Sequence, residues 1–320
     1  MAGGTCGGMV GSLRHVHMYA ETTWGDKPSS PAYIHLPHAS YNARFRSETR
    51  KSALFTGLMA KKHNQKFRGM VTGQLTLPLF GYVRQGQSLA RHILDWGLNP
   101  TDPDNQDYPS KGFQVAESVI SSSKEQNGVR VNQLTITGSD SAPEISMSLD
   151  IVGKTEVNLT TLQTVPDDME KLLNFDFKDT TLVIDSVTTK MASFSFVKAN
   201  GMRGYYLNSS SLTCLPKTSD LVTLSLVVVK DANTYEAEDR GLSPTTEHSI
   251  TLTFKGLHNG TGTGGTNWTV ITMAMPRCSM EPMADDTIEM EGLIFQTLNF
   301  ICLKPDDTQK QYNLTYTEAA

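Results

Sequence analysis

Cysteine is scarce in this sequence, and its apolar runs are short. The four cysteines among 320 residues form no Cys-x-x-Cys pair, so we expect free thiols rather than a disulfide framework or a zinc site. The longest apolar stretch, Leu221–Val229, has the length of a strand, whereas a membrane-spanning helix needs about 20 residues. The N-terminal residues lack the basic and apolar regions of a signal peptide. We therefore expect neither a disulfide-rich protein nor a membrane protein.

Net positive charge and catalytic motifs are also missing. The formal charge is −5 and the pI is about 5.9, whereas a protein built to bind nucleic acid usually has a basic face. The Gly-rich stretch His258–Asn267 lacks the Gly-Lys-Ser/Thr of a phosphate-binding loop. His15 and His17 would share one side of a strand, but the sequence shows no further ligand cluster. We predict no enzyme activity, no metal site and no cofactor.

Strand patterns are what the sequence has in abundance. From Glu144 to Ile151, polar and apolar residues alternate strictly, which is typical of a strand with one dry and one wet face. The dry face would contain Ile145, Met147, Leu149 and Ile151, and the wet face Glu144, Ser146, Ser148 and Asp150. Further strands are predicted at Met70–Leu77, Val129–Thr137, Thr181–Ser186, Ser193–Val197, Leu221–Val229, Ser249–Phe254, Trp268–Met273 and Ile288–Leu298.

One helix is predicted, in the stretch GQSLARHILDWGLN. It places Leu89, Ile93 and Trp96 on one face, Ser88 can cap its start, and Gly97 followed by Asn99-Pro100 should end it.

Two pairs of segments indicate an internal repeat. Met70–Leu77 resembles Leu221–Val228, and Pro143–Gly153 resembles Asp286–Gln296. The second match places Ile151 on Ile294. The alternative is that unrelated strands share the same alternation.

Three stretches resemble the major tail tube proteins of long-tailed, siphovirus-type bacteriophages. Tyr19–Pro37 is similar to the N-terminal lead of that family, with an acidic-aromatic start and a turn before the first strand. Phe67–Phe80, FRGMVTGQLTLPLF, resembles the strand that follows the family's long loop. Val131–Lys154, VNQLTITGSDSAPEISMSLDIVGK, resembles its hairpin. The second half matches more loosely, through Phe175–Ser186 and the strand that begins at Leu221.

The resemblance implies a mainly β fold of tandem tail-tube β-sandwich or β-barrel domains, with one helix in the first copy. We expect an N-terminal arm at residues 1–32, a first domain at 33–163, a linker at 164–174 and a second domain at 175–320. Such domains join neighbours into rings that stack around a channel for DNA. Six domains complete most such rings, so a duplicated chain would form a trimeric, pseudo-hexameric ring.

The wet strand faces are the predicted channel lining. A lining should lack Lys and Arg, because each contact with a phosphate releases counterions and adds affinity. The candidates are Thr72, Gln74, Thr76, Glu144, Ser146, Ser148, Asp150, Glu289 and Glu291. The alternative is that each is an ordinary solvent-facing strand position.

Positive charge is concentrated in Ala43–Arg68, which the family pattern makes a long loop that reaches the next ring. The candidates for this contact are Arg44, Arg46, Arg50, Lys51, Leu54, Phe55, Lys61, Lys62, Lys66 and Arg68. Their charges could meet acidic residues such as Asp102, Asp104 and Asp107. A solvated loop and a nucleic-acid-binding segment are the alternatives. The analogous Lys198–Lys217 is far less basic.

The expected partners are other copies of the chain, the tape measure and tail terminator proteins, and DNA in passage, with no membrane. The protein would belong to the virion tail and assemble in the bacterial cytoplasm. The alternative function is a virion surface or adhesin-type β-sandwich that binds a ligand.

Overall fold

The fold is mainly β, with one α-helix among the described residues and a large antiparallel sheet. The computed structural model describes residues 15–37, 39–51, 64–81, 83–84, 87–99, 102, 107–116, 123–159, 175–230, 247–257, 268–281, 294–305 and 310–317. Within these ranges, no helix has both the length and the apolar character needed to cross a membrane.

The strands up to residue 158 form a first set. They are β1 (His15–Ala20), β2 (Ile34–Leu36), β3 (Ser40–Tyr41), β4 (Arg44–Lys51), β5 (Asn64–Pro78), β6 (Val83–Arg84), β7 (Gln87–Ser88), β8 (Lys111–Ala116), β9 (Lys124–Ser139), β10 (Ala142–Gly153) and β11 (Thr155–Asn158). β5 pairs with β3, β4 and β10, and β10 pairs with β9. β9 also pairs with β8 and β11, while β1 lies between β8 and β2. β6 and β7 form a separate small hairpin.

The second set follows a short 3-10 helix at Phe177–Asp179. It contains β12 (Thr181–Ile184), β13 (Val187–Thr189), β14 (Met191–Ala199), β15 (Leu221–Val229), β16 (Glu247–Leu257), β17 (Trp268–Glu281), β18 (Phe295–Cys302) and β19 (Asn313–Thr317). β15 pairs with β14 and β18, and β18 pairs with β17. β17 also pairs with β16 and β19, while β12 lies between β16 and β13.

The pairing scheme of the first set therefore recurs in the second. β14 takes the place of β3 and β4, β15 of β5, β18 of β10, β17 of β9, β16 of β8, β12 of β1, β13 of β2 and β19 of β11. This recurrence agrees with an internal repeat, which sequence similarity alone supports only weakly.

The strand registers change one detail of the expected repeat. Ile151 lies opposite Gly73, and Phe300 lies opposite Leu224. Because the sequence comparison matches Gly73 with Leu224, the counterpart of Ile151 is Phe300 and not Ile294. Strand alternation repeats every two residues, so a shift by an even number of residues preserves the pattern and escapes a sequence comparison.

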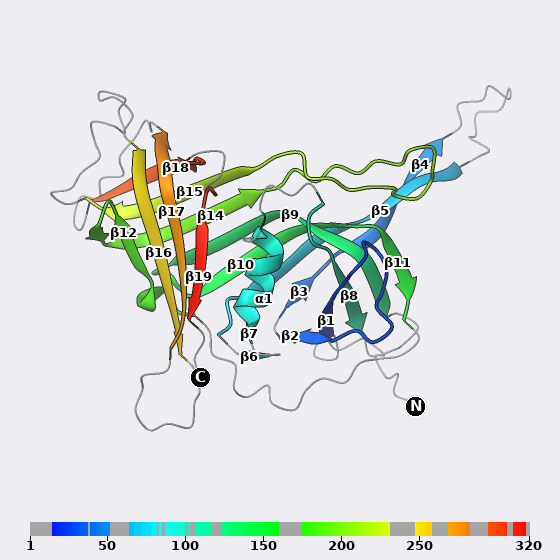
Figure 1. The fold of residues 1–320 in the computed structure, drawn as a ribbon, viewed down its shortest axis with the longest axis horizontal. Helices are drawn as coiled ribbons and strands as arrows, with labels where there is room; N and C mark the ends of the chain where they lie inside the picture. The colour runs from blue at the N-terminus through cyan, green and yellow to red at the C-terminus, as the bar shows by residue number, and fades with distance from the viewer. Residues whose placement is uncertain are drawn as a thin grey trace, which may run out of the picture.

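β9 and β14 join the two sets into one sheet. Gln133–Ser139 of β9 pairs antiparallel with Ser193–Ala199 of β14, a pairing that we call the seam. Figure 1 shows β5, β10, β9, β14 and β15 running side by side through the middle of an elongated molecule. The two sets are therefore hydrogen-bonded to each other along a full strand.

The predicted helix is α1 (Leu89–Leu98), and Ser88 caps its N-terminus as expected. The helix continues through Gly97, however, and the left-handed residue that ends it is Asn99, with φ 47°. Gly97 serves packing instead, because a Cβ there would lie 3.1 Å from the side chain of Leu134.

Both strand sets hold the C-terminal end of α1. The hydroxyl of Tyr108 donates to the carbonyl of Gly97 at 2.7 Å, and the hydroxyl of Tyr312 donates to that of Leu98. The hydroxyl of Tyr316 donates to Asp95 on the same helix at 2.9 Å. Because Tyr312 and Tyr316 belong to the second set, the helix is part of the contact between the sets.

Two predicted strands have different bounds in the structure. The strand expected at Thr181–Ser186 ends at Ile184, because Asp185 and Ser186 adopt positive φ in the turn to β13. The strand expected at Ile288–Leu298 is β18, which begins only at Phe295; residues 288–293 lie outside the described ranges. The other predicted strands overlap β5, β9, β14, β15, β16 and β17.

Part of the expected N-terminal arm is a strand. His15–Ala20, which falls within the expected arm, forms β1, and its residues Met18 and Tyr19 are completely buried. The linker expected at 164–174 lies outside the described residues, so the division into two domains stays a prediction.

Three cysteines are free thiols: Cys214, Cys278 and Cys302. Cys278 and Cys302 lie opposite each other on β17 and β18, with 3.5 Å between their Sγ atoms. This hydrogen bond and burial raise the pKa of the Cys302 thiol.

Candidate functional site

Eight neighbouring strand positions form one continuous layer with a dry face and a polar face. The order is β3 with β4, then β5, β10, β9, β14, β15, β18 and β17. On the dry face, buried side chains such as Leu75, Leu149 and Leu134 belong to the hydrophobic core. Directly opposite residues share a face, so the registers also define rows of neighbours on the other side. We call that side the polar face.

Three rows describe the polar face. The first crosses all eight positions through Ser40, Thr76, Ser148, Thr135, Val197, Thr223, Ile301 and Ser279. The second crosses seven through Pro78, Ser146, Thr137, Ser195, Ser225, Asn299 and Glu281. The third crosses five through Gln74, Asp150, Gln133, Ala199 and Leu221. These rows contain hydroxyls, amides, two carboxylates and five apolar residues, and no Lys or Arg.

Hydrogen bonds between side chains tie this surface together. The amide of Gln74 donates to Asp150 at 3.2 Å, and the hydroxyl of Thr76 donates to that of Ser148 at 3.5 Å. These bonds link neighbouring strands through their side chains on the polar face.

The structure brings six of the nine candidate lining residues together on the polar face. They are Thr72, Gln74, Thr76, Ser146, Ser148 and Asp150. Glu144 is exposed on the same strand but lies beyond the last β5 residue in the register, and its backbone forms an isolated bridge to Asp176. Glu289 and Glu291 lie outside the described residues.

Sequence reasoning missed the part of the polar face that β9 and the second set contribute. The additional members include Thr135, Thr137, Ser193, Ser195, Thr223, Ser225, Thr297 and Asn299. Their alternation was visible in the sequence, but alternation does not say which strands become neighbours. The pairing of β9 with β14 at the seam shows which strands are neighbours.

Both ends of the basic segment Ala43–Arg68 are strands that pair with each other as a hairpin. The expectation that the whole segment is a long loop is therefore wrong for these ends. β4 pairs with β5 from Arg44 to Lys51, whose partner is Asn64. An exposed edge strand can be charged because it has little core to cover, so its charge concealed its strand character. Arg50, Lys51 and Lys66 lie on these strands, while Leu54, Phe55, Lys61 and Lys62 lie outside the described residues.

Positive charge reaches one margin of the polar face. Arg44 is exposed and lies opposite Thr72, so a residue expected on a separate loop is the neighbour of a candidate lining residue. Arg46 is exposed two positions further along β4. The guanidinium of Arg68, also exposed, lies 5.1 Å from the ring centre of Tyr206.

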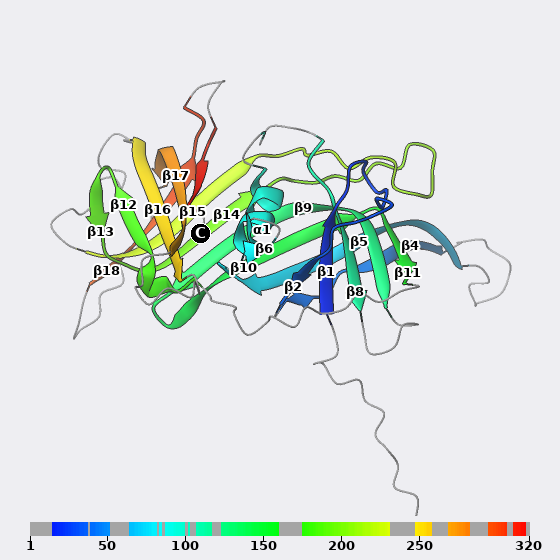
Figure 2. The same ribbon diagram turned by 60° about the horizontal axis from the view of Figure 1, so that its bottom comes forward.

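The segment that contains Tyr206 connects β14 and β15 and runs along the same hairpin. Ser211 forms an isolated bridge with Gly69 of β5. Figures 1 and 2 both show this connection reaching toward the tip of β4 and β5, which project from one end of the sheet. The basic segment and its analogue in the second set therefore lie side by side at one end. Of the acidic residues considered as their partners, Asp107 instead forms an ion pair with the buried Arg130.

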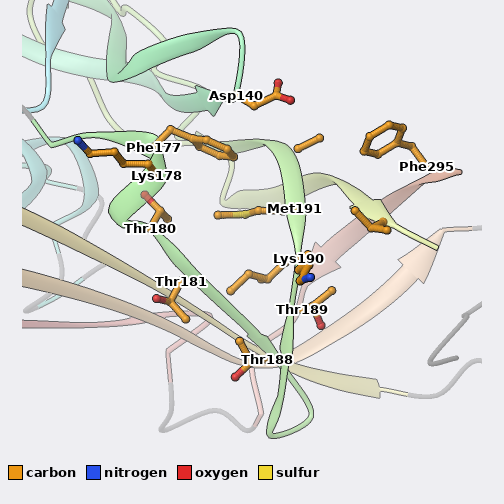
Figure 3. Close-up of a pocket in the computed structure, with 13 residues that line it drawn as sticks. Asp140, Phe177, Lys178, Thr180, Thr181, Thr188, Thr189, Lys190, Met191 and Phe295 are labelled. Carbon is orange, nitrogen blue, oxygen red and sulfur yellow. The ribbon is translucent and has the colours of Figure 1, made fainter. Parts of the chain in front are cut away.

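A pocket of about 510 Å³ lies at the opposite end of the layer (Figure 3). Asp140, in the turn between β9 and β10, contributes to its wall, together with the β12–β13 hairpin. Phe177, Met191 and Phe295 supply apolar surface. The volume is within the range of ligand pockets, about 300 to 1,000 Å³, and the mixed lining also suits a protein segment.

A buried lysine lies at the seam. Lys198 of β14 is completely buried on the dry face, and its ammonium group forms an ion pair with Asp220. The ammonium of Lys217 lies 3.1 Å from the same carboxylate. Burial lowers the pKa of Lys198 to about 8, although the carboxylate of Asp220 acts in the opposite direction. Lys198, Lys217 and Asp220 therefore form a cluster of charged side chains next to the seam.

Histidines gather at the other end of the first set. His17 on β1 lies opposite His35 on β2, with ring centres 4.9 Å apart. In the part of the chain that the structure describes, no group of three His, Cys, Asp or Glu side chains has the geometry to hold a metal ion.

A protein-family model described as phage tail tube protein matches residues 11–302 of the chain. No curated protein matches the chain significantly.

Proposed function

The chain belongs to the phage tail tube protein family, and we propose from this premise that it forms rings that stack around a central channel for DNA. Membership makes the protein a structural component of the virion tail that assembles with itself and with other tail proteins. The ring, its symmetry, the lining of the channel and the contacts between rings are the proposal.

The observation that supports the channel lining most directly is the continuity of the polar face across the seam. A row of side chains crosses eight strand positions and both strand sets without a break. DNA must slide along a lining, and every Lys or Arg that contacts a phosphate would add affinity by releasing counterions. Three rows without such residues meet this requirement, and Asp150 and Glu281 add a weak repulsion.

The recurring pairing scheme supports a ring of three chains. We propose that residues 33–163 and 175–320 are two tube domains and that three chains complete a pseudo-sixfold ring. Within the chain, β14 of the second set pairs with β9 of the first. The counterpart of β14 is the edge formed by β3 and β4, which pairs only with β5 among the described strands. That edge can take a second copy in a head-to-tail contact that closes a ring.

The two ends of the sheet support stacking of the rings. The β4–β5 hairpin and the segment between β14 and β15 project from one end, and the pocket lies at the other. A head-to-tail stack would bring the hairpin end of one ring to the pocket end of the next. The exposed Arg46 and Arg68, with the candidate residues beyond them, would then lie at the contact between rings.

The expected partners at the ends of such a tube are the tail terminator and, inside it, the tape measure protein. DNA would pass through without sequence-specific contacts. We propose that assembly takes place in the host cytoplasm, where the thiols of Cys278 and Cys302 would stay reduced.

Negative-stain electron microscopy of the purified protein tests the proposal. The expected result is rings or tubes with a central hole, and a cross-section with six lobes built from three chains. Native mass spectrometry of the rings gives the number of chains independently. Persistent monomers that bind carbohydrate would instead favour an adhesin-type β-sandwich.

A further inference from the structure

The edge formed by β3 and β4 is capped by one side chain of β9, Gln126, and one of β11, Glu156. Residues of β4 bond alternately inward to β5 and outward to whatever lies beside the edge. The outward carbonyl of Ala43 accepts a hydrogen bond from the Gln126 amide at 3.0 Å. The outward N–H of Phe45 donates to the Glu156 carboxylate at 3.0 Å.

The two capping side chains are held in place by each other. The Gln126 amide also donates to the Glu156 carboxylate at 2.8 Å, and the Gln126 carbonyl accepts from the Tyr41 hydroxyl. Gln126 is 1% exposed, so its position is set by packing as well as by hydrogen bonds. The result is a connected network that satisfies the main chain of an edge strand.

The second set has no such cap at the corresponding place, because a strand lies there. Through the registers with β5 and β15, Ser40–Arg46 corresponds to Ser193–Ala199. In the second set, this stretch makes its outward pairing with β9 across the seam. Gln126 and Glu156 therefore occupy, beside the first-set edge, the position that a β-strand occupies beside the second-set edge.

We propose that Gln126 and Glu156 form a removable cap that keeps this edge from pairing until a second copy of the chain displaces them. The proposal rests on the ring proposed above and adds a step that controls when the ring can form. An open strand edge pairs with any available strand and promotes aggregation. A neighbour that supplies a complete strand can replace the bonds to Ala43 and Phe45, while the bond between Gln126 and Glu156 persists.

The decisive variant is Glu156→Ala, which removes the acceptor for the Phe45 N–H. We expect it to shorten the lag before tubes appear in light scattering by about tenfold, since a hydrogen bond to a charged group must no longer be broken. Glu156→Gln retains an acceptor oxygen and should behave nearly as the natural chain does. Glu144→Ala removes another carboxylate of the first set and controls for the loss of charge.

Hydrogen exchange at the Phe45 amide provides a second measurement. In monomers, this amide should exchange faster in Glu156→Ala than in the natural chain, and in tubes it should be equally protected in both. A lag in Glu156→Ala no shorter than in Glu144→Ala would overturn the cap, as would slower assembly. If the natural chain forms no rings at all, the proposed function fails instead, so the two failures are distinguishable.

Discussion

Single side chains decide how DNA would interact with the polar face. Ser146 and Ser148 project from the middle of the first set, where each adjoins a polar residue of β9. Small uncharged hydroxyls at these positions can offer a phosphate a hydrogen bond but no positive charge, so they release no counterions. Long basic side chains would reverse this property without disturbing the dry face of the same strand.

We predict that the double variant Ser146→Lys, Ser148→Lys forms normal tubes but slows DNA passage by roughly an order of magnitude, more at low salt. The lysines would bind phosphates by releasing counterions, and this binding weakens as salt rises. The measurement is the rate of DNA ejection from virions that contain the variant.

Thr315→Lys is the matched control, because Thr315 is exposed on β19, which is not part of the eight-position layer. Ejection that is unchanged in the double variant would remove Ser146 and Ser148 from the channel lining.

Because Lys198 is buried at the seam, its titration makes the stability of the fold depend on pH. Its folded pKa of about 8 lies below its ordinary value of 10.5. Between these pH values the unfolded chain binds more protons than the folded one, so this group makes stability rise with pH. Below pH 8 both states are protonated, and the cost of the buried charge is fully present.

We expect the free energy of unfolding of the natural chain, relative to Lys198→Met, to rise between pH 8 and 10.5 by up to about 3 kcal/mol. Urea unfolding at several pH values measures this difference. Lys255→Met, which removes an exposed lysine from β16, is the comparison variant. A difference that stays constant across this range would contradict the account of Lys198.

At the scale of elements, a glycine of β5 allows close contact with the link between β3 and β4. Gly73 packs against Ala43 in that link, and a Cβ on Gly73 would overlap the backbone of Ala43. The same glycine falls in the stretch that resembled the tail tube family. Close backbone approach explains why that position suits glycine in this chain.

Gly73→Ala should therefore destabilise the fold by about 1 to 3 kcal/mol, because an added methyl group must push the backbone of Ala43 away. Thr76→Ala on the same strand alters a side chain without adding volume and serves as the control. Urea unfolding curves would show the difference. Equal stability of the two variants would mean that the chain around Ala43 can move aside at little cost in free energy.

At the scale of the whole molecule, the two ends of the sheet differ in shape. One end has projecting hairpins with exposed arginines, and the other has a pocket. An assembly that adds the same contact repeatedly in one direction needs two unlike, complementary ends.

Deleting Ala53–Ala60 should weaken the stacking of rings more than the closure of each ring. The deleted residues belong to the segment between β4 and β5 and lie outside the described ranges. Electron microscopy should show single rings or short stacks in place of long tubes. Stacked tubes of normal length would exclude this segment from the contact between rings.

Much of the fold could be predicted from the sequence, because strand alternation is a local property. The dry and wet faces of Ile145–Ile151, the bounds of β15 and the cap at Ser88 all follow from neighbouring residues. The charged hairpin could not be recognised in the same way, because Arg44–Lys51 becomes a strand through its pairing with β5. The same holds for the cap of Gln126 and Glu156, whose partners are 83 and 111 residues away in the chain.

The sequence by itself determined that the protein is mainly β, which side of each clear strand is wet, and that it resembles a tail tube subunit. Only the tertiary structure decided that β9 and β14 meet, that the wet faces join into one surface, and that the first edge is capped. The reason is physical: alternation assigns residues to the two faces of a strand, whereas register and neighbours depend on contacts between distant segments.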